Sequence, residues 1–358
     1  MLQPLRRIAI KQETTRMEPF AIDLALQGGG SHGAFTWGVL DALLEDGSLR
    51  FSGISGTSAG ALNAAVLATG LARGGNEGAR RALRAFWLDV SRAGQCFGAL
   101  QPPALPGWTQ PSSMPLWGWT PADWFQSWAR SFSPYQLNPF GLNPLRDLVA
   151  QHVDVDALRA APPALFVIAT SVTTGQPRVF SGADLTLDAL MASTCLPHLF
   201  RAVEIDGEPY WDGGYAGNPA LWPLIYETPE SDLLLVKINP LKRPATPRTA
   251  LAIADRVSEI GFNTALAGEM RAIAFVQKLL AQERIERGLY KDLRLHMIAD
   301  EGELASLEAA TKLDTRQSFL ERLFALGREA AQRWLGEHRA DVGVRATLDI
   351  AATFLAPR

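Results

Sequence analysis

Two consecutive strand–turn–helix units near the start of the chain constrain the fold more than any other feature. In the first, the apolar run of residues 20–27 stops at three glycines, and apolar residues then recur at helical spacing up to Gly47. In the second, the short apolar run of residues 51–56 leads into the small-residue segment 58–70, which predicts a helix closed by Gly70. Strands that alternate with helices are the building units of a parallel sheet, so the sequence predicts an α/β fold.

Three later apolar segments extend this pattern. Residues 164–171, 232–239 and 292–300 are typical of buried strands, and helical segments separate them. The alternation favours a mostly parallel central sheet. Beyond it, residues 307–335 place apolar side chains at helical spacing with charges between them, which predicts a long amphipathic helix or a pair of helices.

The same pattern divides the chain into regions. We expect a flexible N-terminal extension at residues 1–19, an α/β domain over residues 20–300, and a C-terminal helical region, residues 301–358, packed on that domain. Residues 100–144 interrupt the domain with many prolines and with half of the ten tryptophans of the chain. Indole rings favour the boundary between water and an apolar phase. This insert therefore has two interpretations, a cap or lipid-surface contact and a loop packed onto the sheet.

Charge and composition exclude several classes of protein. A formal net charge of −3 gives no basis for nucleic-acid binding, and the two cysteines lie too far apart for a C-x-x-C motif. No apolar run is long enough for a spanning helix, and residues 1–20 lack the pattern of a secretory signal. We therefore expect a cytoplasmic protein with no metal site and no nucleic-acid partner. The sequence gives no basis for an oligomeric state.

The glycines of the first unit have the G-x-G-x-x-G spacing of dinucleotide sites, at Gly28, Gly30 and Gly33. Such a site also needs an acidic residue about twenty positions later for the ribose hydroxyls. No Asp or Glu occurs between Gly47 and Asn76, and no Gly-Lys-Ser/Thr follows that would make a P-loop. Backbone amides at a strand end are suited instead to hold an oxyanion. A plain tight turn is the alternative.

The second unit carries a candidate nucleophile. The sequence GTSAG at residues 56–60 matches the G-x-S-x-G elbow, in which small neighbours let the chain turn sharply enough to expose the hydroxyl of Ser58. The helix that follows directs free amides and the positive end of its dipole toward a developing oxyanion. A serine that only caps the helix is the alternative interpretation.

A base for this serine is less evident from the sequence. The chain has five histidines, and none follows an Asp or Glu in the arrangement of an α/β-hydrolase. Asp212 comes after a short predicted strand and before two glycines, and it could act directly on Ser58 if a low-dielectric pocket raises its proton affinity. A surface turn is the alternative interpretation of this Asp-Gly-Gly.

Three motifs in this order resemble those of the patatin-like phospholipase family: GGGSHG at residues 28–33, GTSAG at residues 56–60 and DGG at residues 212–214. Residues 192–215 also resemble the family segment that leads into its aspartate, and the resemblance extends over residues 22–239. It implies a three-layer α/β/α fold and a serine–aspartate dyad that needs neither a metal nor a diffusible cofactor.

Residue by residue, the resemblance implies that Ser58 is the nucleophile and Asp212 the base. The chain departs from the family at His32, where an arginine or lysine is usual. A histidine can be neutral near pH 7, which puts a phospholipid headgroup preference in doubt more than hydrolysis itself. His32 either supports the loop or packs as an ordinary polar residue at the start of the helix. The oxyanion loop corresponds to Gly28, Gly29 and Gly30.

The function that the resemblance implies is hydrolysis of carboxylic ester bonds in phospholipids or related acyl esters, through an acyl-serine intermediate. Two alternatives stay open: depolymerisation of an intracellular polyester such as poly(3-hydroxybutyrate) at the same site, and lipid binding without turnover. The expected partners are a lipid or acyl ester substrate and, peripherally, the surface of a membrane or lipid granule.

Overall fold

The computed structural model describes residues 18–98, 133–138, 141–243, 246–286, 288–307 and 309–355. Of the expected N-terminal extension, only residues 18 and 19 fall within these ranges. The five tryptophans of the expected insert, which carried the cap interpretation, lie outside the described residues.

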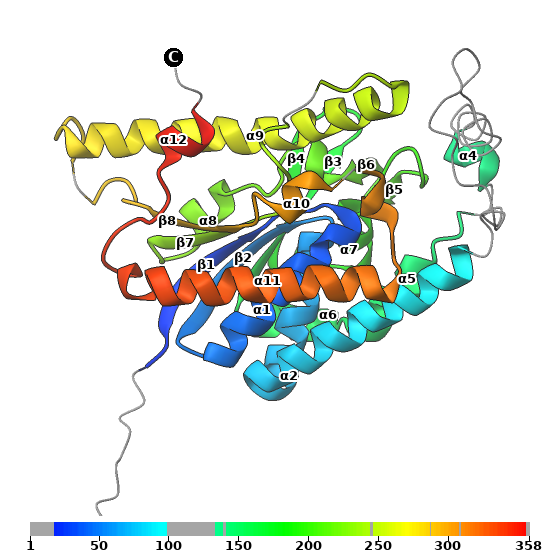
Figure 1. The fold of residues 1–358 in the computed structure, drawn as a ribbon, viewed down its shortest axis with the longest axis horizontal. Helices are drawn as coiled ribbons and strands as arrows, with labels where there is room; N and C mark the ends of the chain where they lie inside the picture. The colour runs from blue at the N-terminus through cyan, green and yellow to red at the C-terminus, as the bar shows by residue number, and fades with distance from the viewer. Residues whose placement is uncertain are drawn as a thin grey trace, which may run out of the picture.

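Within the described residues, an eight-stranded sheet forms the centre of the protein, and helices cover both of its faces (Figure 1). Its order is β5-β6-β3-β2-β1-β7-β8, with β4 paired to β3. The pairs from β3 to β8 along this order are parallel, which confirms the predicted mostly parallel sheet, whereas β4, β5 and β6 pair antiparallel. The strands are β1 (Phe20–Leu26), β2 (Leu49–Thr57), β3 (Ala164–Ser171), β4 (Pro177–Phe180), β5 (Val203–Ile205), β6 (Glu208–Asp212), β7 (Asp232–Lys237) and β8 (Arg294–Ala299).

Helices of very different length connect the strands. The α-helices are α1 (Gly33–Asp46), α2 (Ala59–Gly98), α4 (Pro134–Leu137), α5 (Pro144–His152), α6 (Val155–Ala160), α7 (Leu187–Ser193), α8 (Trp222–Glu227), α9 (Ala250–Ala281), α10 (Glu303–Ser306), α11 (Gln317–His338) and α12 (Ile350–Phe354). The short 3-10 helices are η1 (Gly30–His32), η2 (Gly182–Asp184), η3 (Gly213–Tyr215), η4 (Ala309–Leu313) and η5 (Arg339–Asp341).

Two predicted helix boundaries differ from the structure. The helix after Ser58 does not end at Gly70, because α2 continues to a kink at Gly74 and Gly75, where the backbone angles are not helical. Gly70 serves a packing role: a Cβ atom there would lie 2.4 Å from the Cα atom of Ala79 in the second half of α2. The segment predicted as one long helix or a helix pair over residues 307–335 forms η4 followed by α11.

The alternation of side chains along the central strands produces two apolar clusters, one on each face of the sheet. Along β1, Leu24 and Leu26 contribute to one cluster and Ala25 to the other. The first cluster contains buried side chains of α1, α2 and α11, and the second contains those of α8, α9 and α12. The predicted three-layer α/β/α architecture is therefore confirmed, with α11 of the C-terminal region in one outer layer (Figure 1).

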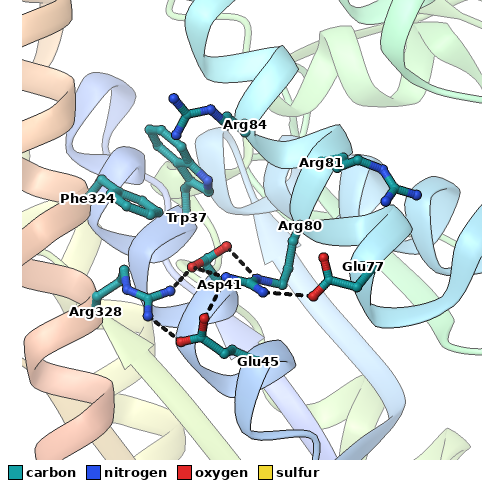
Figure 2. A pocket seen from close by; sticks show the side chains of 9 residues that line it. All are labelled: Trp37, Asp41, Glu45, Glu77, Arg80, Arg81, Arg84, Phe324 and Arg328. Atoms are coloured by element: carbon teal, nitrogen blue, oxygen red, sulfur yellow. Dashed lines mark hydrogen bonds and ion pairs between the residues drawn. The ribbon is translucent and has the colours of Figure 1, made fainter.

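Ion pairs connect the three helices of the first layer at their outer side (Figure 2). Arg80 of α2 and Arg328 of α11 both pair with Asp41 of α1, the Arg80 Nε–Asp41 Oδ1 distance being 2.9 Å. Both arginines also pair with Glu45 one turn later. These side chains line a pocket of about 330 Å³ that contains none of the predicted site residues. The network holds α11 against α1, and with it the segment that precedes α11.

Candidate active site

Ser58 lies in the sharp turn between β2 and α2. Its φ angle of 54° is in the left-handed region, which is rare for a residue with a side chain. The Ser58 amide donates to Ser193 Oγ at 2.9 Å, and Leu62 N donates to the Ser58 carbonyl oxygen at 3.1 Å. Gly60 allows the turn to pack on β1, since a Cβ atom there would lie 2.2 Å from the Leu26 carbonyl oxygen. The local geometry is the sharp strand-to-helix turn expected for a G-x-S-x-G sequence.

Asp212 ends β6 beside this turn. The register of β3 shows that Asp212 lies close to the serine turn. Ile168 of β3 pairs with Thr57 of β2, and the next residue, Ala169, pairs with Asp212. The Asp212 side chain is buried, with a relative exposure of 1%, so it does not lie in a surface turn. The structure thus brings Ser58 and Asp212 together from segments more than 150 residues apart in the sequence.

The electrostatics of Asp212 suit a base. Burial raises the pKa of its carboxyl from 3.8 to about 6, against the lowering effects of the Gly214 amide, the Ser58 side chain and the charge of Lys312. Oδ1 accepts a hydrogen bond from Gly214 N at 2.8 Å. Oδ2 is buried and has no hydrogen-bond partner within the described part of the chain. One carboxylate oxygen is therefore anchored, and the other is available for a proton.

The glycine loop, Gly28–Gly30, lies directly against the serine turn. A Cβ atom on Gly28 would lie 2.5 Å from the Thr57 carbonyl oxygen and 2.7 Å from Ser58 Cβ, so only glycine fits. The Gly28 amide donates to Asn218 Oδ1 at 2.7 Å. The amides of Gly29 and Gly30 donate to no residue that the structure describes. Of the three predicted oxyanion donors, two are open and one is already engaged.

Polar side chains from other segments hold this loop in place. Asn239 Nδ2 donates to the Gly28 carbonyl oxygen at 2.7 Å. Gln27 Oε1 accepts from the amides of Ile238 and Asn239, both at 2.9 Å, and Gln27 Nε2 donates to the Asn218 carbonyl oxygen at 3.0 Å. Asn218 and Asn239 were not predicted as site residues from the sequence. The available signal was the position of Asn239 just after β7, since sites gather at the carboxyl ends of parallel strands.

His32 lies next to the loop, at the end of η1, with a relative exposure of 2%. Its Nε2 is 2.7 Å from Thr311 Oγ1 in η4, and its Nδ1 has no hydrogen-bond partner among the described residues. Burial, and next the charges of Lys312 and Arg243, lower the pKa of His32 from 6.5 to about 3. At neutral pH the ring is therefore uncharged and contacts the C-terminal region.

The thiol of Cys195, whose pKa responds to Asp212, is unreactive. Burial, and next the Asp212 carboxylate, raises the pKa of the Cys195 thiol to about 12, so it is not a thiolate at neutral pH. Among the described residues, no three His, Cys, Asp or Glu side chains gather as a metal site would require. In the same part of the chain, no helix is both long and apolar enough to cross a lipid bilayer.

Comparison with protein families matches residues 24–225 to the model described as patatin-like phospholipase. Among solved structures, VipD from Legionella pneumophila is 15% identical, with 86% of this chain and 67% of that chain covered and a TM-score of 0.33. A chain of the heterodimeric ExoU-SpcU complex from the type III secretion system of Pseudomonas aeruginosa is 18% identical, with 88% and 52% covered and a TM-score of 0.33. The present chain therefore spans about half the length of that one. Comparison with curated proteins found no match.

Proposed function

This chain belongs to the patatin-like phospholipase family, and we propose that Ser58 and Asp212 are the dyad with which it hydrolyses carboxylic esters of phospholipids or related lipids. The observation that carries the proposal is the interaction of the Ser58 side chain with the buried Asp212 carboxyl, whose pKa it lowers, at the point where β6 ends beside the serine turn. A carboxyl whose pKa rises to about 6 is a much stronger base than an exposed aspartate and is still mostly ionised at neutral pH.

In the first half of the reaction, Asp212 accepts the proton of the Ser58 hydroxyl while Oγ forms a bond to the ester carbonyl carbon. The carbonyl oxygen gains the negative charge, and the open amides of Gly29 and Gly30 are the donors suited to bind it. When the tetrahedral intermediate collapses, the carbon–oxygen bond to the alcohol breaks and the alcohol takes the proton from Asp212. The acyl group then remains on Ser58.

In the second half, water attacks the acyl-serine. Asp212 accepts a proton from the water, the same loop binds the second oxyanion, and the bond from the acyl carbon to Ser58 Oγ breaks. The serine oxygen takes the proton back, and the free acid leaves. This sequence returns both side chains to their starting state without a metal or a diffusible cofactor.

The test uses active-site labelling and hydrolysis of p-nitrophenyl butyrate by the full-length protein. We expect a fluorophosphonate probe to label the wild type and not Ser58→Ala, and Asp212→Asn to lower kcat by about a thousandfold. Asp206→Asn, in the exposed turn before β6, is the matched control and leaves kcat unchanged. Full labelling or turnover by Ser58→Ala contradicts the proposal.

A panel of substrates then distinguishes the classes of ester. Ser58-dependent release from phospholipid or lysophospholipid supports the proposed function, whereas release only from poly(3-hydroxybutyrate) supports the polyester alternative at the same site. Acyl-chain binding without labelling supports a non-catalytic lipid-binding protein. The expected cytoplasmic location, with peripheral contact to a membrane or granule surface, stays a prediction, as do the expected domain boundaries.

A further inference from the structure

A positively charged side chain, that of Lys312 in the C-terminal region, lies next to the glycine loop. Lys312 of η4 donates from Nζ to Asn239 Oδ1 at 2.8 Å. The loop itself carries no charged side chain, since it consists of three glycines, and His32 beside it is neutral at pH 7. Lys312 lies outside residues 24–225, so it does not belong to the part of the chain that matches the family.

The backbone of η4 packs on the loop as well. A Cβ atom on Gly30, whose φ angle is +59°, would lie 2.3 Å from the Lys312 carbonyl oxygen. The preceding residue, Thr311, is in contact with His32 through its hydroxyl. Two consecutive residues of η4 therefore touch two residues of the loop and of η1. This double contact gives the lysine a defined position relative to Gly28–Gly30.

The hydrogen bonds of Asn239 connect this cation to a proposed oxyanion donor. Lys312 Nζ donates to the amide oxygen of Asn239, and the amide nitrogen of Asn239 donates to the Gly28 carbonyl oxygen at 2.7 Å. That carbonyl belongs to the same peptide group as the open N–H of Gly29. A donor at the carbonyl oxygen polarises a peptide group and makes its N–H a stronger donor, and a cation at the end of the chain increases the effect.

We propose that Lys312 is a positioning residue of the acyl-transfer reaction, which through Asn239 polarises the Gly28–Gly29 peptide and thereby strengthens the Gly29 amide as an oxyanion donor. The inference rests on the proposed function, and it makes the C-terminal region a part of the active site. Lys312 touches neither the ester nor the reacting atoms.

In the described part of the chain, charged and titratable groups from several elements lie around Lys312. Asp212 ends β6, His32 ends η1, Arg243 follows β7, and Glu259 belongs to α9. Glu259 pairs with Arg243, the Nη2–Oε1 distance being 2.5 Å. The Lys312 charge lowers the pKa of Asp212 and of His32, so removing it raises both pKa values.

The test compares Lys312→Met with Lys312→Arg and with Lys278→Met, an exposed lysine of α9, in the full-length protein. With p-nitrophenyl butyrate, we expect Lys312→Met to lower kcat at least tenfold with KM within about twofold, while Lys312→Arg keeps most of the activity. The acidic limb of the kcat/KM profile of Lys312→Met moves to higher pH. The His32 pKa, measured by NMR titration, rises in Lys312→Met and not in Lys278→Met.

A double-mutant cycle with Asn239→Ala separates this role from a structural one. At a pH where Asp212 is ionised in every variant, the effect of the charge on kcat acts through Asn239, so Lys312→Met should lower kcat much less in the Asn239→Ala background than in the wild type. An unchanged kcat in Lys312→Met overturns the inference while Ser58-dependent activity of the wild type persists. Equal losses of kcat and of unfolding temperature in Lys312→Met and Lys312→Arg overturn it as well. If the wild type shows no Ser58-dependent turnover, the proposed function is wrong, and this inference is wrong with it.

Discussion

Gly327 of α11 lies against the backbone of Phe35 in α1, so closely that a Cβ atom on Gly327 would be 2.0 Å from the Phe35 carbonyl oxygen. The contact is reciprocal, since a Cβ atom on Gly38 would be 2.0 Å from the Phe324 carbonyl oxygen. Phe35 belongs to the first turn of α1, just after the glycine loop, and α11 follows η4 closely. The two glycines therefore let the backbones of α1 and α11 pack directly against each other.

Substitution of Gly327 should separate the two helices. We expect Gly327→Ala to lower the free energy of unfolding by about 1 to 3 kcal/mol or more, because a methyl group has no space against the α1 backbone. The matched control is Gly336→Ala in the same helix, where a Cβ atom meets nothing within 4 Å. That change should be neutral or stabilise by up to about 1 kcal/mol. Urea unfolding measures both, and equal effects would show that the close contact is absent.

Activity should depend on the protonation of Asp212. Only the ionised carboxylate accepts the serine proton, so kcat/KM of the wild type should rise about tenfold per pH unit below pH 6 and level off above pH 7. His32, with a pKa of about 3, adds no further step above pH 5. A pH–rate profile between pH 4.5 and 9 with a soluble ester measures this. A flat profile down to pH 4.5 would contradict the raised pKa.

The burial of the Asp212 carboxylate should also lower the free energy of unfolding at neutral pH. The pKa of Asp212 is about 6 in the folded state and near 3.8 when unfolded, so the folded state binds more protons between these values and stability falls as pH rises through this window. Asp212→Asn retains an oxygen for the Gly214 amide and removes the buried charge. We expect this variant to be more stable than the wild type by about 1 to 3 kcal/mol at pH 7.5. Denaturant unfolding at pH 7.5 and pH 4 checks it, since the difference should shrink at pH 4.

The left-handed backbone conformation of Ser58 should lower the free energy of unfolding for any residue with a Cβ atom at this position. Glycine adopts a φ angle of 54° without the steric cost that a Cβ atom brings, so Ser58→Gly should unfold at higher urea concentration than Ser58→Ala. The expected difference is about 1 kcal/mol, and both variants should be inactive. Chemical unfolding of the two proteins, side by side, measures it. Equal stability would mean that the turn relaxes away from this conformation.

Several elements were predictable because their signal is local. The central strands were recognised from their continuous apolar runs, and β6 was expected before Asp212 because a short strand precedes the Asp-Gly-Gly. The edge strands β4 and β5 were not predicted, since with four and three residues they are too short for a periodic pattern to stand out. The predicted end of the helix after Ser58 was wrong because Gly70 was taken as a terminator, whereas it is a site of close helix packing.

The sequence by itself determined the sharp serine turn, the glycine loop and the order of the three motifs, because backbone conformation at a turn depends on neighbouring residues and on glycine in particular. Only the tertiary structure decided the electrostatics around them. Burial raises the pKa of Asp212, and contacts across more than 70 residues bring Lys312 to Asn239. A pKa and a long-range hydrogen bond depend on which segments pack together, and the spacing of residues along the chain does not contain that information.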